Sequence, residues 1–175
     1  QLKLLLLISL KQELRGFLSL LVEDPHLLDG CRLVIRKYPY SWQGEQEEII
    51  REIRSFCPHI TAEEGELLPQ IENCDVAIVS SSSAGLEAML CGRPLIHLDI
   101  HDIIDLDPYG TKGCNAPVLR CSDAESFKTS LDFLKTLSDC DYTNLVKQQT
   151  EWARKVYAEP NPMGWAELLQ QNRAA

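Results

Sequence analysis

Several features that often reveal a function are missing from this sequence. It contains no block of lysine or arginine, and its formal net charge of −9 is strongly acidic. A nucleic-acid groove or a polybasic membrane patch is therefore not expected. The seven cysteines are odd in number and form no Cys-x-x-Cys pair. Reduced, buried thiols in a cytoplasmic protein are therefore a better interpretation than a disulfide framework.

Long apolar runs are also missing. The stretch 2–10 is far below the roughly 20 residues of a membrane span, and no small-residue cleavage site follows it. We expect a buried first strand there rather than a signal peptide. The sequence does not begin with Met, which favours a piece of a longer protein.

The most informative segment present is 74–99, with the sequence CDVAIVSSSSAGLEAMLCGRPLIHLD. Residues 76–79 form a short apolar run, as expected of a strand that is buried on both faces of a parallel sheet. Good helix formers occupy 84–90, and Gly92 and Pro94 end that helix. A second strand follows at 95–98. The pattern predicts strand, turn, short helix, strand.

Four serines, at positions 80–83, lie in that turn. A helix N-terminus carries about half a positive charge, so serine hydroxyls and free backbone N–H groups there favour an anion such as phosphate. The alternative is that the serines only cap the helix and form the turn. Glu87 lies about one helical turn further on, where its carboxylate can reach a ribose beside such a phosphate.

The stretch SSAGLEAMLCGRP resembles the donor-nucleotide motif in the C-terminal half of GT-B fold glycosyltransferases. Similar segments occur in UDP-N-acetylglucosamine 2-epimerases, lipid A disaccharide synthases and the glycerophosphotransferases of teichoic acid and capsule synthesis. The resemblance implies that Ser82 and Ser83 bind phosphate and that Glu87 binds ribose. It places Ser81 and Gly85 in the same nucleotide site.

Strand and helix patterns alternate along the whole chain. This alternation predicts an α/β fold with a doubly wound, mostly parallel Rossmann-like sheet and helices on both faces. The length of 175 residues suits one core. We expect one nucleotide-sugar-binding domain over 1–158 and a tail helix over 159–175. The expected strands are 4–9, 32–37, 60–61, 76–79, 95–98 and 118–119, and the expected helices are 14–22, 45–56, 65–71, 84–90, 122–137 and 144–157.

Ligands of such sheets bind beyond the carboxyl ends of the strands, at the point where the strand order reverses. This rule selects Lys11 and Arg36 as cations for a phosphate, with a solvated loop as the alternative for each. It places Tyr38, His97 and Asp99 at the rim of the pocket. In relatives of the resembled family a histidine is frequent at the position of Tyr38, so the glycerophosphotransferase subgroup is disfavoured.

Metal and hydrolase chemistry are weaker alternatives. His97, Asp99 and His101 would share one face of an extended strand and could bind zinc or iron. No second cluster supports that site, so we expect no metal and no other cofactor. The serine turn lacks the Gly-x-Ser-x-Gly pattern of a hydrolase elbow.

These expectations describe half an enzyme. The resemblance implies transfer of a sugar or polyol phosphate from a nucleotide donor in bacterial surface polysaccharide synthesis. It also implies a missing N-terminal half that holds the acceptor and the catalytic base, and it leaves open a peripheral association with the inner membrane through that half. We therefore nominate no catalytic residue and expect no activity from the isolated chain. An epimerase-type enzyme and a non-catalytic nucleotide- or phosphate-binding module remain alternatives.

Overall fold

A computed structural model of the protein describes residues 1–37, 43–100, 108–110 and 116–156. Strands and helices alternate along these residues, as the sequence predicts. The strands are β1 (Leu2–Leu7), β2 (Cys31–Arg36), β3 (Thr61–Glu63), β4 (Val76–Val79), β5 (Leu95–Leu98) and β6 (Leu119–Cys121). The helices are α1 (Lys11–Glu23), α2 (Gln43–Phe56), α3 (Leu67–Glu72), α4 (Ala84–Leu90), α5 (Ala124–Thr136) and α6 (Asp139–Val156).

The strands form one six-stranded sheet in the order β3-β2-β1-β4-β5-β6. Every pairing among them is parallel. The chain builds outward from β1 to β3, then crosses back and builds outward on the other side from β4 to β6. The strand order therefore reverses between β1 and β4, and the predicted α/β fold class is confirmed.

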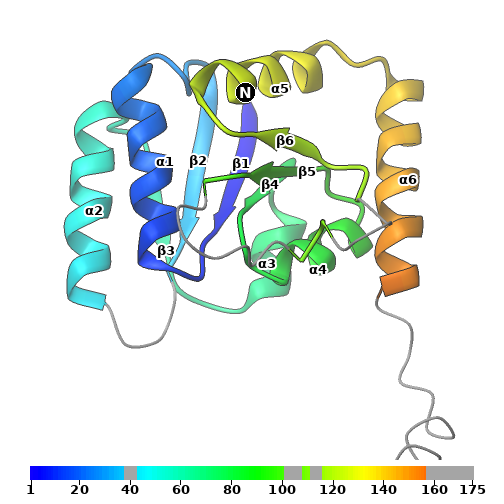
Figure 1. The fold of residues 1–175 in the computed structure, drawn as a ribbon, viewed down its shortest axis with the longest axis horizontal. Helices are drawn as coiled ribbons and strands as arrows, with labels where there is room; N and C mark the ends of the chain where they lie inside the picture. Colours follow the sequence, from blue (N-terminus) through cyan, green and yellow to red (C-terminus); the bar gives the residue numbers. More distant parts are fainter. Residues whose placement is uncertain (38–42, 101–107, 111–115, 157–175) are drawn as a thin grey trace, which may run out of the picture.

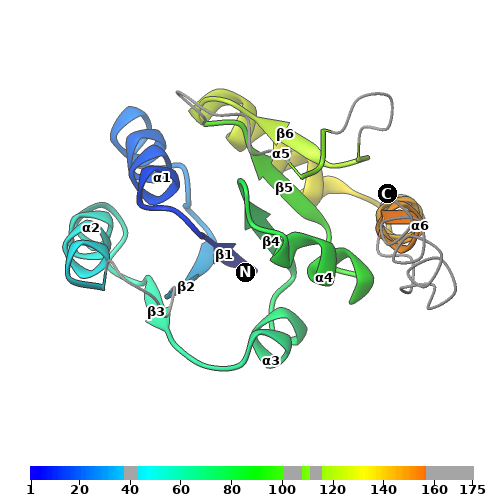
Figure 2. The same cartoon turned by 60° about the horizontal axis from the view of Figure 1, so that its bottom comes forward.

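Helices cover both faces of the sheet (Figures 1 and 2). Leu4 and Leu6 of β1 point into a core shared with α1, α2 and α5. Leu5 and Leu7 point into a second core shared with α3, α4 and α6. The continuous leucine run of β1 is explained by this double burial, because each successive side chain enters the opposite core.

The expected boundaries differ most from the structure at α6, which begins at Asp139 rather than at 144. The Ser138 hydroxyl accepts a hydrogen bond from the Asp141 N–H at 3.2 Å and donates one to the Asp141 carboxylate at 2.6 Å. A serine with an acidic residue three positions later starts a helix in this way. The tail helix expected over 159–175 lies outside the described residues.

Two further properties concern the described residues only. None of their helices combines the length and the apolar character needed to cross a membrane. Their six cysteines are free thiols. Cys31, Cys74 and Cys121 are buried, as expected, whereas Cys57 is half-buried, and Cys91 and Cys140 are exposed, which corrects the expectation of burial.

Candidate nucleotide site at the reversal of strand order

The serine turn, Ser80 to Ser83, follows β4 directly and lies where the strand order reverses. β1 and β4 are neighbours, with Leu7 opposite Val79 at their carboxyl ends. The turn that leads from β1 into α1 therefore lies beside the serine turn. This is the place where open α/β sheets bind ligands.

Glu13 of α1 joins the two turns and was not recognised in the sequence. Its side chain is only 2% exposed. One carboxylate oxygen accepts the N–H groups of Ser9 and Leu10, each at 2.9 Å. The other accepts the N–H of Ser81 at 2.7 Å and also its hydroxyl. A sequence signal did exist: Glu13 is three residues after Leu10, where a capping-box glutamate reaches back to the first N–H groups of a helix.

Two other buried groups hold the serine turn. The Ser80 hydroxyl, with no exposed surface, donates to the Leu98 carbonyl at 2.8 Å. The Tyr109 hydroxyl donates to the Ser82 carbonyl. Tyr109 fits because Gly85 has no side chain: a Cβ there would lie 3.0 Å from Tyr109 Cζ. Gly85 is buried, so the structure gives this predicted nucleotide contact a packing role.

Ser82 and Ser83 both retain some solvent exposure. Ser83 is exposed, and its hydroxyl does not cap α4. The half-buried Ser82 accepts the Ala84 N–H at 3.3 Å through its hydroxyl oxygen, which leaves its own proton available. Glu87 lies in the first turn of α4 with a half-buried side chain. Helix capping therefore explains one hydrogen bond of the Ser82 side chain. It explains no contact of the Ser83 side chain.

The two predicted cations bind partners within the chain. Lys11 forms an ion pair with Glu45 at 2.5 Å, and this pairing lowers the pKa of the Glu45 carboxyl. Arg36 donates to the Gly65 carbonyl at 2.6 Å and to the Gln70 side chain at 2.9 Å. Arg36 thus holds the loop before α3. Neither cation reaches the serine turn through these contacts.

The three residues predicted at the pocket rim have different outcomes in the structure. His97 has no exposed surface and packs edge-on against the Tyr109 ring, with centroids 5.4 Å apart. This interior position corrects the expectation that it lies at a rim. Asp99 is exposed just beyond the carboxyl end of β5, as the expectation requires. Tyr38 lies outside the described residues, and so does His101.

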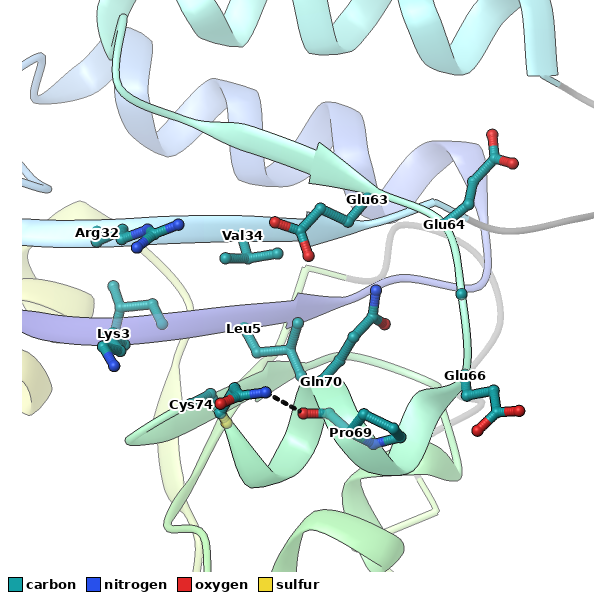
Figure 3. A pocket seen from close by; sticks show the side chains of 13 residues that line it. Lys3, Leu5, Arg32, Val34, Glu63, Glu64, Glu66, Pro69, Gln70 and Cys74 are labelled. Carbon is teal, nitrogen blue, oxygen red and sulfur yellow. Dashed lines mark hydrogen bonds between the residues drawn. The ribbon is translucent and has the colours of Figure 1, made fainter.

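A cavity lies elsewhere on the sheet. It is an open groove of about 450 Å³ over β1, β2, β3 and α3, and no residue of the serine turn lines it. Figure 3 shows Lys3 and Arg32 at one end, and Glu63, Glu64 and Glu66 at the other. The serine turn is the better candidate for the ligand site, because it follows β4 at the carboxyl end of the sheet, where the strand order reverses.

Metal binding finds no support among the described side chains, where no three His, Cys, Asp or Glu residues gather as a metal site would require. His97 and Asp99 are among these side chains, whereas His101 lies outside the described residues. The expected absence of metal stays a prediction.

No family profile and no curated protein matches this sequence. Solved structures do match in fold. A UDP-forming α,α-trehalose-phosphate synthase from Burkholderia vietnamiensis is similar over 99% of this chain and 46% of its own, with a TM-score of 0.63 and 12% identity. The chain therefore has an α/β Rossmann-like fold similar to that of part of this enzyme.

Two more structures agree. The catalytic domain of starch synthase IV from Arabidopsis thaliana matches over 99% of this chain and 38% of its own, with a TM-score of 0.57 and 16% identity. A UDP-N-acetylglucosamine 2-epimerase from Listeria monocytogenes, described as putative, matches over 89% of this chain and 43% of its own, with a TM-score of 0.57 and 12% identity. This chain spans less than half of each of the three proteins. At these identities the likeness establishes the fold alone.

Proposed function

We propose that this chain is the donor-nucleotide-binding half of a glycosyltransferase. In this proposal Ser82 and Ser83 bind the diphosphate, and Glu87 accepts hydrogen bonds from the ribose. The supporting observation is the place of the serine turn at the reversal between β1 and β4. Hydroxyl and N–H donors at the start of α4 stabilise the charge of a departing diphosphate.

The structural neighbours support the choice of a nucleotide. The starch synthase structure is bound to ADP, and the Burkholderia vietnamiensis enzyme is UDP-forming. The sequence resemblance extends the proposal to a sugar or polyol phosphate donor in surface polysaccharide synthesis. The missing half would hold the acceptor and its base, so the isolated chain binds donor without transferring it.

The test measures how tightly this chain binds UDP, CDP, GDP and ADP, and compares each diphosphate with its nucleoside. EDTA is present to remove divalent metal ions. Thermal shift provides the screen, and calorimetry provides Kd. A ligand that binds only the folded state stabilises it by about 2.7 kcal/mol at a hundredfold excess over Kd. We expect at least one diphosphate to raise Tm more than its nucleoside does. If all diphosphates leave Tm unchanged, the proposal fails.

Glu87→Gln tests the ribose contact. Loss of one charge-assisted hydrogen bond should weaken nucleotide binding by about 1.5–3 kcal/mol while the fold stays intact. Glu125→Gln is the matched control, because Glu125 lies in the first turn of another helix, α5, and is exposed. Equal affinity of Glu87→Gln and the unaltered protein would remove the ribose role.

An epimerase-type enzyme is the second candidate, favoured by the Listeria monocytogenes neighbour. Both functions require nucleotide binding, so binding alone does not separate them. Incubation of the full-length protein with UDP-N-acetylglucosamine does: a 2-epimer without any acceptor indicates the epimerase, and a glycoside indicates the transferase.

A further inference from the structure

The hydrogen bonds around Glu13 form a closed anion hole. Four donors converge on its carboxylate: the N–H groups of Ser9, Leu10 and Ser81, and the Ser81 hydroxyl. They come from two turns that are far apart in the sequence and adjacent in space. A buried carboxylate is stable only when such donors replace its lost water.

The occupied hole changes the role of Ser81. A serine hydroxyl has one proton, and the Ser81 proton is directed to Glu13. The Ser81 N–H is used as well, at 2.7 Å. Ser81 therefore has no donor left for a second anion, although the sequence placed it among the nucleotide contacts. The next two serines both retain some solvent exposure, as described above.

We propose that Glu13 is a positioning residue: it fills the anion hole between the two turns and thereby presents Ser82 and Ser83, but not Ser81, to a phosphate. The identity of the ligand rests on the proposed function above. The anion hole around Glu13 does not rest on the proposed function, because the hydrogen bonds that define it join groups of this chain.

The geometry explains why a negative group lies at the base of an anion site. Without Glu13 the three partly buried N–H groups would lose their partner, or an external anion would fill the hole. With Glu13 in place an external phosphate must bind further out. The carboxylate thus fixes where the phosphate sits as well as the shape of the turn.

The experiment is chemical rescue of Glu13→Ala. The substitution removes a group of about the size of acetate. We expect Tm to fall by about 5–10 °C, since buried donors lose their partner. Acetate should then restore part of that loss in a saturable way. Acetamide, which has the same shape without the charge, and sodium chloride at equal ionic strength should not.

Two controls keep the result specific. Glu48→Ala removes an exposed carboxylate from α2 and should leave Tm unchanged, with or without acetate. Ser81→Ala keeps the carboxylate and its three N–H partners, so this variant folds even if Glu13→Ala does not. We expect Ser81→Ala to bind UDP within twofold of the unaltered protein, whereas Ser83→Ala loses about tenfold or more.

The positioning role has a separate readout. In Glu13→Ala the affinity for UDP should fall at least about fivefold more than that for uridine, and acetate should restore the UDP affinity. A role in stability alone would lower Tm and leave the ratio of the two affinities unchanged, which would overturn the proposal. A tenfold loss of UDP affinity in Ser81→Ala would overturn it too. If no diphosphate binds even the unaltered protein, the proposed function fails, and acetate rescue of Tm still decides whether the anion hole exists.

Discussion

The serine turn and the groove over β1–β3 are two very different regions of the same sheet. The groove has a volume of about 450 Å³, and its charges are of both signs and lie at opposite ends. The serine turn lies at the strand-order reversal, and buried side chains fix it from several sides: Glu13, Ser80 and Tyr109.

The difference shows what a phosphate site requires. Donors must point to one place and must stay there without a ligand, because ordering them on binding reduces affinity. Internal hydrogen bonds hold the serine turn in place without a ligand. The groove has a flexible lysine and arginine at one end, where free rotation of long side chains costs entropy on binding. Five predictions test or sharpen this comparison.

The largest effect is expected for Ser82→Gly combined with Ser83→Gly. Both hydroxyls are lost, while glycine preserves the helix start within a few tenths of a kcal/mol. We expect UDP affinity to fall by at least about tenfold, or 1.4 kcal/mol, and uridine affinity to change little. Calorimetry with both ligands measures this. An equal loss for uridine would mean that the turn shapes the pocket without touching phosphate.

The second effect concerns the support behind the turn. Gly85→Ala places a Cβ 3.0 Å from Tyr109 Cζ. Overpacking of this kind costs about 1–3 kcal/mol of unfolding free energy. Gly44→Ala is the matched control, because a Cβ at Gly44 in α2 would meet nothing within 4 Å. Urea unfolding should show a loss for the first variant and no loss for the second. Equal midpoints would show that Tyr109 moves aside at little cost.

Much of the serine-turn region could be predicted from local sequence. The predicted bounds of β4, α4 and β5 coincide with those observed, because apolar runs, helix formers and a Gly-Arg-Pro stop act over a few residues. The place of the turn at the carboxyl end of β4 also follows from alternation and the rule for parallel sheets, whereas its place at the strand-order reversal comes from the observed strand order. These signals need no knowledge of distant partners.

The contacts of the turn could not be predicted in the same way. Glu13 and Ser81 are 68 residues apart, and only the folded sheet brings β1 and β4 together. The same applies to Arg36, whose partner Gln70 is 34 residues away. Arg36 lies at the carboxyl end of its strand, so the sequence indicates a ligand contact. In the structure its side chain instead holds a loop. His97 read as a rim residue because the sequence does not show that Tyr109 covers it.

The third prediction concerns Cys74, which lines the groove but whose side chain is buried beneath α3. Burial raises the pKa of its thiol to about 11. At pH 8 only about one thiol in a thousand is then ionised, so alkylation of the native protein should be very slow. The exposed Cys140 should react first. Peptide mapping after timed alkylation measures both rates. Fast labelling of Cys74 would show that α3 opens readily.

The raised pKa also fixes a stability window. Because the neutral thiol is favoured in the folded state, its contribution is complete below the unfolded pKa of about 9 and is lost as pH rises through the folded value of about 11. The free energy of unfolding should fall between these two pH values. Part of that fall should be missing in Cys74→Ala, compared by urea unfolding at several pH values.

The smallest effect is expected in the groove itself, from Lys3→Gln combined with Arg32→Gln. Both residues lie near the amino ends of their strands, β1 and β2, whereas ligands of parallel sheets bind at the carboxyl ends. The carboxyl end of the groove carries Glu63 and its acidic neighbours, which repel a diphosphate. We therefore expect UDP affinity within twofold of the unaltered protein, and stability within about 0.5 kcal/mol because both side chains are exposed. The serine double variant is the positive control in the same calorimetric series. A tenfold loss of UDP affinity from the two groove cations, with none from the serines, would move the nucleotide site into the groove and reverse the comparison.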